Sequence, residues 1–501
     1  MATAASTQPR LSYSLTRRAR PDHAHLAEKD STPICVDLDG TLLRTDLLLE
    51  TFLAAVRQNP LVLIMAPYWL LRDGKAALKA KLVGLVKLDP ALLPYHQPLI
   101  AFLREKKEAG HKLYLTSAAN LQLAEQIADH VGIFDGVLAS DARNNLKGAR
   151  KLRAIRALLG DQPFVYAGNS REDLPIWRAS NAAITVNPPR SVAASLRREG
   201  VSVAAGFGSL RPRWKAAIKA LRVYQWSKNV LIFLPLLLGH AFDLPRIVSA
   251  GVAFLAFSLC ASAFYLFNDL LDLDADRAHP RKRQRPFASG ALSIQEGLGL
   301  LAAMVPAVLL ISMWLPPEAR WLLALYCGVN LLYSIKLKRV LFLDVLTLAC
   351  FYALRVLVGG AASAIVVSIW TIAFSIFLFL GLALVKRLTE LRRAKNQSRG
   401  SVARRAYLPI DISMVRSLAG SALYLSVLVL AMYINSAEVH KMYARPEALW
   451  FVCLLLIYWV SRVLMLANRG KLTDDPIVFA FRDRASYGVA ALVLVCVAVA
   501  H

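Results

Sequence analysis

The feature that most constrains this chain is a series of nine apolar runs in its C-terminal part. The runs lie at about 229–242, 247–267, 294–315, 320–334, 341–363, 366–385, 415–434, 447–467 and 485–501. A helix needs about 20 mostly apolar residues to cross a bilayer, so the shorter runs need their flanks to cross. The pattern predicts an all-α polytopic membrane domain with nine transmembrane helices over residues 206–501.

Charge gives this predicted membrane domain an orientation. The loops at 268–293, 335–340, 386–414 and 468–484 carry 5, 3, 8 and 4 Lys or Arg residues, and the loops between them carry few. Basic loops face the cytoplasm, so we expect an integral protein of a bacterial-type inner or plasma membrane, with His501 on the far side. The net charge of +26 accompanies apolar spans, which argues against nucleic acid as a partner.

The first 205 residues have a different pattern. Residues 1–30 are polar and basic, and we expect a disordered cytosolic tail there. Strand-like runs at 34–38, 112–116, 136–139, 164–167 and 183–186 alternate with helical segments. That alternation favours a parallel sheet covered by helices. The sequence predicts a cytoplasmic α/β, Rossmann-like domain over residues 31–205, with a small helical cap at about 50–100.

Residues able to do chemistry follow these strands. Asp37 and Asp39 end the first strand in an Asp-Leu-Asp-Gly-Thr turn, Ser117 ends the second, and Asp173 follows the fourth. Ligands of parallel sheets bind at the carboxyl ends of the strands. With Lys147, these motifs stand in the order found in haloacid dehalogenase-like phosphatases, which residues 31–205 resemble.

The resemblance implies a role for each of these residues. Asp37 would be the nucleophile and Asp39 the general acid and base, which divides one difficult displacement into two easier ones. The other implied residues are Thr41, Ser117 and Lys147 for the phosphoryl oxygens, and Asp173 with Asp37 and the Asp39 carbonyl for Mg²⁺. Asn169 stands where many relatives carry an acid, so we expect a weaker metal site. The alternative is a degenerate domain kept as a scaffold.

An acidic cluster closes the second apolar run. Its members are Asn268, Asp269, Asp272 and Asp276, and the three carboxylates fall at i, i+3 and i+7, on one helical face. Such carboxylates repel one another unless a cation joins them, and acids beside a membrane are functional candidates. The following loop contributes the basic residues Arg281, Lys282 and Arg285. Together they predict a Mg²⁺ site for a phosphorylated ligand; a solvated charged loop is the alternative.

At these residues the chain resembles the UbiA superfamily of intramembrane prenyltransferases, over roughly residues 211–501. A motif before the first span also matches, with Arg222, Gln225, Lys228 and Asn229. The superfamily usually has a second acidic motif, DxxxD, after the sixth span, and the chain lacks it there. Lys386, Arg387 and Glu390 stand at that place instead. With Arg355, Tyr407 and Asp483, the pattern resembles the decaprenyl-phosphate phosphoribosyltransferase branch.

The resemblance implies a bifunctional membrane enzyme. Its transferase domain would join polyprenyl phosphate to phosphoribosyl diphosphate with Mg²⁺, and its phosphatase domain would remove the 5-phosphate of the lipid-linked product. The alternatives are an aromatic polyprenyltransferase of the 4-hydroxybenzoate type with an independent phosphatase, and a transporter with a regulatory phosphatase. Expected partners are the two substrates and membrane lipids, and a homo-oligomer is left open.

Overall fold

The computed structural model describes residues 32–501, apart from 142–144, 209–212, 397–405, 473–475 and 481. The predicted tail of residues 1–30 lies outside these described residues. The described chain divides into two compact units. The first holds the residues up to Leu221 together with Tyr265–Leu301, and the second holds Arg222–Phe264 and Ala302–His501. The first unit therefore includes the acidic cluster and the segment that follows it.

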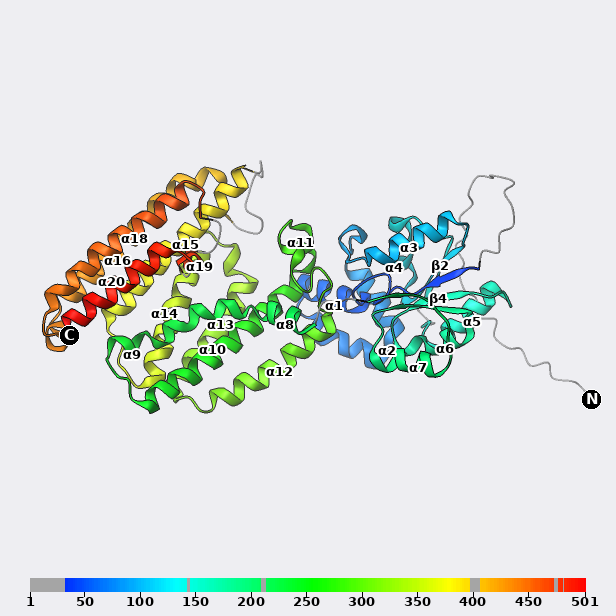
Figure 1. The fold of residues 1–501 in the computed structure, drawn as a ribbon, viewed down its shortest axis with the longest axis horizontal. Helices are drawn as coiled ribbons and strands as arrows, with labels where there is room; N and C mark the ends of the chain where they lie inside the picture. Colours follow the sequence, from blue (N-terminus) through cyan, green and yellow to red (C-terminus); the bar gives the residue numbers. More distant parts are fainter. Residues whose placement is uncertain (1–31, 142–144, 209–212, 397–405, 473–475, 481) are drawn as a thin grey trace, which may run out of the picture. The chain divides into compact units, whose positions relative to one another are not determined.

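A six-stranded parallel sheet forms the centre of the first unit (Figure 1), in the order β3-β2-β1-β4-β5-β6. The strands are β1 (Ile34–Val36), β2 (Leu113–Asn120), β3 (Gly136–Ser140), β4 (Val165–Gly168), β5 (Ala182–Val186) and β6 (Val203–Phe207). The five predicted strands are confirmed. β6 is an additional edge strand, and its mostly exposed residues lack the apolar run that marked the others.

Helices cover both faces of this sheet. On one face, α3 (Gln97–Glu108) and α4 (Leu121–Val131) bury leucine and isoleucine side chains against β1 and β2. On the other, α5 (Ala149–Leu159), α6 (Leu174–Ala179) and α7 (Arg190–Arg198) pack on the sheet around Trp177 and Tyr166. The alternation of strand and helix predicted these two covered faces.

The predicted cap region, between β1 and β2, contains two longer helices, α1 (Leu47–Gln58) and α2 (Val62–Leu85). Asp46 caps α1 by accepting hydrogen bonds from the backbone N–H groups of Leu48 and Leu49. Within α2, Gly74 has a φ of 80° and interrupts the helical backbone. Residues 61–71, which lead into α2 and form most of its part before Gly74, are all apolar or aromatic.

The first unit also contains the connection from the end of α10 (Leu244–Leu271) through α11 (Leu273–Ala278) to the start of α12 (Ile294–Ser312). The second unit is helical (Figure 1). Its further helices are α9 (Leu234–Leu238), α13 (Pro317–Ile335), α14 (Leu343–Ser363), α15 (Ile369–Asn396), α16 (Ile412–Ile434), α17 (Ala437–Met442), α18 (Trp450–Asn468), α19 (Pro476–Ala480) and α20 (Arg484–Ala500). Apolar side chains of α14, α15, α16 and α18 form its largest core.

The predicted count of nine transmembrane helices is not confirmed. Among the described residues, six helices are long and apolar enough to cross a membrane: α10, α12, α14, α15, α16 and α18. The first predicted run is broken into a 3₁₀ helix over Val223–Phe233 and the five-residue α9. Polar residues such as Glu318 and Arg320 make α13 less apolar, and α20 has only 17 residues.

Candidate functional site

Asp37 lies immediately after β1, in the middle of the sheet, where its backbone N–H donates to the Ala167 carbonyl at 2.9 Å. Its side chain is paired with Lys151, whose Nζ lies 2.7 Å from Asp37 Oδ1, and both side chains are nearly inaccessible. Burial raises the pKa of Asp37 to about 6, although the Lys151 ammonium opposes that shift. The pair holds a buried carboxylate in a fixed position, as the predicted role of Asp37 requires.

Asp39 occupies the turn that follows, where its Oδ1 accepts a hydrogen bond from the Leu47 backbone N–H at 2.9 Å. Burial, followed by the nearby Asp46 carboxylate, raises the pKa of Asp39 to about 7. Burial raises the pKa of both carboxyls. Asp37 has an ammonium partner at hydrogen-bond distance, Lys151, which favours its ionised form, whereas the Asp46 carboxylate favours the protonated form of Asp39.

Asp173 is fixed beside this pair by four hydrogen bonds. Its Oδ2 accepts from the backbone N–H groups of Asn169 and Ser170 and from the Ser170 hydroxyl, at 2.9–3.0 Å, and its Oδ1 accepts from the Tyr166 hydroxyl. The Asn169 side chain lies over Gly40, where a Cβ would meet its Nδ2 at 2.0 Å. Gly40 also has a φ of 74°, so only glycine suits this turn.

Two of the predicted phosphate-binding side chains, Thr41 and Ser117, are fully buried. Thr41 Oγ1 has no hydrogen-bond partner among the described residues, whereas Ser117 Oγ accepts from the Ala119 backbone N–H. Lys147 is the third of these side chains. Its ammonium is paired with Glu172 and is partly exposed.

Lys151 is the lysine that the sequence analysis missed. Because α5 begins at Ala149, Lys151 lies in its first turn, from where it reaches Asp37 and also the Tyr166 hydroxyl at 3.1 Å. The signal that could have identified it is its basic character on the face of α5 that otherwise buries Ala154 and Ile155. A lysine buried on the sheet side of a helix needs a carboxylate partner.

Magnesium fits this site by the chemistry of its donors. Asp37 and Asp173 offer carboxylate oxygens and Asp39 offers its main-chain carbonyl oxygen, which are the ligands that a hard cation prefers, and the charge of Asp173 acts on Asp37. Among the described residues, however, no three acidic, histidine or cysteine side chains converge closely enough to form a ready metal cluster. Asp173 would have to exchange one of its four hydrogen bonds for the ion.

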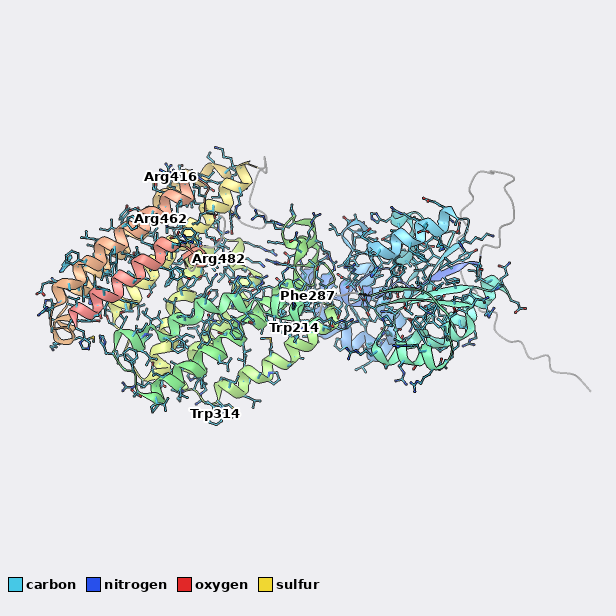
Figure 2. The ribbon with its side chains drawn as sticks, in the orientation of Figure 1. Trp214, Phe287, Trp314, Arg416, Arg462 and Arg482 are labelled. Carbon is cyan, nitrogen blue, oxygen red and sulfur yellow. The ribbon has the colours of Figure 1, made fainter. Side chains whose placement is uncertain are left out.

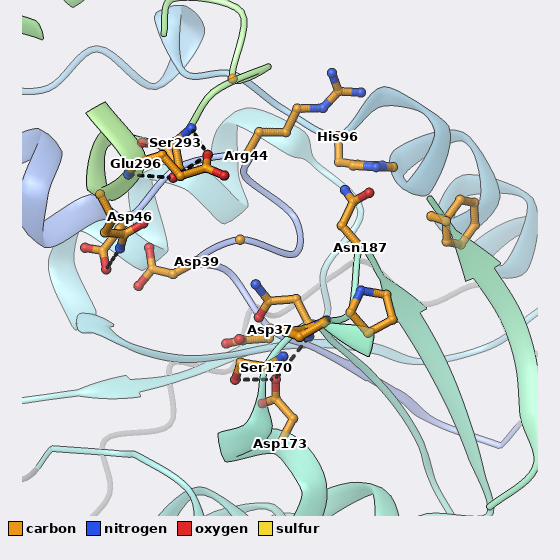
Figure 3. A pocket seen from close by; sticks show the side chains of 18 of the residues that line it. Asp37, Asp39, Arg44, Asp46, His96, Ser170, Asp173, Asn187, Ser293 and Glu296 are labelled. Atoms are coloured by element: carbon orange, nitrogen blue, oxygen red, sulfur yellow. Dashed lines mark hydrogen bonds between the residues drawn. The ribbon is translucent and has the colours of Figure 1, made fainter. Parts of the chain in front are cut away.

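A cavity of about 2110 Å³ opens over these residues. Ten Lys or Arg and six Asp or Glu side chains line it, so it favours anionic ligands. Part of its lining comes from residues 284–296 of the same unit, where Gln295 Nε2 donates to Asp46 Oδ2 at 3.2 Å. Figure 3 shows Asp37 and Asp173 on one side of the cavity, and Ser293 and Glu296 across from them.

The acidic cluster of the first unit is centred on a guanidinium. Arg285 Nη1 lies 3.0 Å from Asp269 Oδ1 and 2.6 Å from Asp276 Oδ2, and both carboxylates are buried. The predicted continuous helical face is interrupted, because α10 ends at Leu271 and Asp272 precedes α11. Asn268 and Asp272 are half-buried, and Arg281 and Lys282 are exposed. The oxygen donors fit Mg²⁺ in kind, and Arg285 shows that this place accepts positive charge.

In the second unit, Arg355 and Asn229 form a buried pair, with Arg355 Nε 2.8 Å from Asn229 Oδ1. The Arg355 guanidinium also lies 4.9 Å from the ring centre of Phe257 and 5.1 Å from that of Tyr352. Asn229 donates in turn to Ser258 Oγ. Of the neighbouring predicted residues, Lys228 is buried, Arg222 adopts a φ of 52°, and Gln225 donates to the Tyr224 hydroxyl.

Arg387 lies in a buried ion-pair network of the second unit. Its Nη2 is 2.8 Å from Asp344 Oδ2, Nη1 contacts Glu390, and Tyr407 donates to Asp344 Oδ1 at 2.8 Å. Arg387 is 1% exposed, whereas its neighbour Lys386 is half-buried. The sequence analysis did not identify Asp344 as a partner of Arg387. The signal that could have identified it is its position as an acid at the start of an apolar span.

Asp483 has a structural partner in Arg462, a residue of α18 labelled in Figure 2. Two hydrogen bonds of 2.7 and 2.9 Å join the guanidinium to the carboxylate. Asp483 also caps α20 by accepting from the Ser486 backbone N–H. This predicted site residue therefore holds the last helix to α18.

Comparison with known proteins identifies two families in the chain. The UbiA prenyltransferase family matches residues 230–497, and the haloacid dehalogenase-like hydrolase family matches residues 34–178. The uncharacterized protein y4nM of Sinorhizobium fredii is 35% identical over 465 residues, which cover 92% of this chain and 89% of that protein.

Two further similarities concern the helical part alone. A decaprenyl-phosphate phosphoribosyltransferase of Mycolicibacterium smegmatis is 30% identical over 276 residues, which cover 53% of this chain and 86% of that protein. A UbiA homologue from Archaeoglobus fulgidus, solved with DMAPP and Mg²⁺, superposes with a TM-score of 0.44 at 16% identity, over 56% of this chain and 99% of that chain.

Proposed function

This chain belongs to the UbiA prenyltransferase family, and on that premise we propose that its helical part joins a polyprenyl phosphate to phosphoribosyl diphosphate. In this reaction a phosphate oxygen of the lipid attacks C1 of the ribose, and the bond from C1 to the diphosphate breaks. Asp269, Asp272 and Asp276 would hold Mg²⁺, which when bound neutralises the departing diphosphate. Lys386 would bind a phosphate of the donor.

The observation that carries this proposal is that α15 has two basic residues where the family usually has a second acidic motif. Ionisation of a prenyl diphosphate suits two acidic motifs, but α15 carries Lys386 and Arg387, and Arg387 engages the available carboxylates Asp344 and Glu390. A cation there opposes a second metal site and favours a phosphate-rich donor. The similarity to a decaprenyl-phosphate phosphoribosyltransferase supports the same donor.

We further propose that the hydrolase domain removes the 5-phosphate of the lipid-linked product. Asp37, held by Lys151, would attack the phosphorus, and Asp39 would protonate the departing ribose oxygen. Asp39 would then take a proton from the water that hydrolyses the aspartyl-phosphate. The residues support this order, because the Lys151 ammonium favours an ionised Asp37 while burial and the Asp46 carboxylate favour a protonated Asp39. Lys151, and not the more exposed Lys147, would stabilise Asp37.

A donor screen with the purified full chain tests both steps. Polyprenyl phosphate with labelled phosphoribosyl diphosphate should give a labelled lipid and inorganic phosphate. An Asp37→Asn variant should accumulate the phosphorylated lipid and release no inorganic phosphate. If the chain instead labels hydroxybenzoate from a prenyl diphosphate, the aromatic alternative is correct.

The acidic cluster can be tested in the same screen. Asp272→Asn should abolish formation of the labelled lipid while the protein keeps its thermal unfolding temperature and its hydrolase activity. Asp269→Asn should abolish it too, but with a lower unfolding temperature, because the buried Asp269 carboxylate is paired with Arg285. Asp274→Asn is a suitable control. Asp274 lies between Asp272 and Asp276 in the sequence, but it is not one of the proposed metal ligands, and its carboxylate lies 3.9 Å from Arg57. Near-normal transfer by either test variant at saturating Mg²⁺ would show that the metal assignment is wrong.

A further inference from the structure

The hydrolase cavity has a wall that comes from far along the sequence. Residues 284–296 line it together with the turn that carries Asp39. A buried ion pair holds this segment in place: Arg277 Nη2 lies 2.6 Å from Glu50 Oε1, Arg277 Nε donates to the Ala288 carbonyl, and both charged side chains are at most 5% exposed. Glu50 also accepts a hydrogen bond from Thr45. Glu50 therefore connects the wall, residues 284–296, to the catalytic turn, residues 39–46.

Arg44 lies where this wall meets the catalytic turn. Its backbone N–H donates to the Pro94 carbonyl at 2.9 Å, and a Cβ on Gly290 would meet Arg44 Cβ at 2.5 Å. The root of the Arg44 side chain is therefore fixed by close packing. Its guanidinium is exposed in the cavity (Figure 3) and projects on the His96 side, away from Asp37 and Asp173.

The Arg44 guanidinium makes no hydrogen bond or ion pair with any residue that the structure describes. Three lysines near Asp37 are engaged: Lys151 by Asp37, Lys147 by Glu172, and Lys79 by the Asn145 side chain at 3.2 Å. Other basic residues, among them Lys75, Arg171 and Arg190, also line the cavity. Arg44 is distinguished by its root, which packs against Gly290 of the wall. A guanidinium fixed at its root and free at its tip can bind a phosphate through two parallel hydrogen bonds.

We propose that Arg44 binds a second phosphate of the hydrolase substrate, the phosphodiester, while Asp37 attacks the phosphomonoester. The substrate class is then a sugar phosphate bearing an additional phosphodiester, as on a lipid-linked ribose 5-phosphate. This inference rests on the proposed function, because it requires that Asp37 hydrolyses a phosphomonoester. It adds a selectivity for two phosphates over one.

Two water-soluble probes test this selectivity with the full-length protein: ribose 5-phosphate, and the same sugar carrying a hexyl phosphodiester at C1. The unaltered protein should prefer the second probe in kcat/KM. Arg44→Gln should lower kcat/KM for the second probe by about 10- to 100-fold, the value of a charge-assisted hydrogen bond, and change the first by less than about threefold. Arg153→Gln, at an exposed arginine of α5 outside the cavity, is the matched control.

A second pair of variants moves the wall without altering a charge. Gly290→Ala places a methyl group against Arg44 and should reduce the preference for the two-phosphate probe. Gly160→Ala should not, because Gly160 shares the positive φ of Gly290, at 62° against 68°, but a Cβ at Gly160 meets no atom within 4 Å. Equal losses on both probes, or no loss on either, would overturn the Arg44 subsite alone. If the unaltered protein hydrolyses neither probe, the proposed phosphatase function fails and the inference fails with it.

Discussion

At the scale of single residues, charges around Asp39 set the pH range in which it can act as an acid. Asp37 must be ionised to attack, so hydrolysis should rise as the pH increases through about 6. Asp39 must be protonated to donate, so hydrolysis should fall as the pH increases through about 7. The profile of kcat/KM against pH should therefore be a narrow bell.

The Asp46 carboxylate is the largest electrostatic cause of the raised Asp39 pKa, after burial. Asp46→Asn should shift the alkaline limb of the bell to lower pH and leave the acid limb in place. Asparagine can still accept the capping hydrogen bonds from Leu48 and Leu49. Asp89→Asn, at another capping aspartate, should leave both limbs unchanged. An alkaline limb that stays or moves upward in Asp46→Asn contradicts the assignment of Asp39.

Lys386 and Arg387 are neighbours in sequence but should respond differently to alanine. Removing Arg387 leaves the buried Asp344 carboxylate without its partner, which should destabilise the fold by about 3–5 kcal/mol. Lys386→Ala should keep the unfolding temperature and raise the KM for phosphoribosyl diphosphate by about one to two decades. Thermal unfolding in detergent and initial rates measure both effects. An unchanged KM in Lys386→Ala favours the aromatic alternative.

At the scale of elements, the sequence predicted those features that depend on local patterns. Strand and helix alternation located β1 to β5 and the carboxyl-end position of Asp37, Asp39 and Asp173. The choice between Lys147 and Lys151 depends on the residue at which α5 begins, and helix starts are set by tertiary packing as much as by local sequence. The break after α10 is of the same kind, because no proline or glycine marks it. The role of Arg44 depends on contact with residues 284–296, which are remote in sequence.

The Arg277–Glu50 pair should be a large stabilising contact of the first unit. Arg277→Met leaves Glu50 buried without its partner, at a cost of about 3–5 kcal/mol. The matched control is Arg178→Met, which breaks an exposed Arg–Glu contact with Glu199 and should hardly change the unfolding temperature. Differential scanning of both variants in detergent makes the comparison. Equal unfolding temperatures would mean that residues 277–296 do not pack on α1.

The first half of α2 should contact the membrane surface. Ile64 and Leu71 of this half are 75% and 88% exposed, and Leu61, just before the helix, is 61% exposed. The basic residue Arg72 follows them. In the full-length protein reconstituted with anionic lipid, a polarity-sensitive fluorescent amino acid in place of Ile64 or Leu71 should report an apolar environment. The same probe in place of Val203, an exposed valine of β6, is the control and should report water. If the probes in α2 also report water, the hydrolase must reach lipid-linked substrate through its tether alone.

At the scale of the whole molecule, one chain joins a family of membrane transferases to a family of hydrolases, and y4nM is similar over both parts. The proposed product of the first reaction has a long prenyl tail and stays in the bilayer. A hydrolase fused to the transferase acts on that product without releasing it, provided that both reactions occur at the same side of the membrane. The distribution of basic loops predicts that side to be the cytoplasm.

The side of the membrane on which the chain ends shows whether the number of crossings is odd or even. Nine crossings put His501 opposite the hydrolase domain. In the part of the chain that the structure describes, six helices satisfy the length and hydropathy of a span, and α20 is shorter at 17 residues. The charge distribution predicts that a fluorescent reporter fused after Arg339, in a basic loop, folds and emits in the cytoplasm. The same reporter fused after His501 should stay dark, and a periplasmic alkaline phosphatase reporter should be active there. Fluorescence at His501 would show an even number of crossings and would exclude the nine-span arrangement.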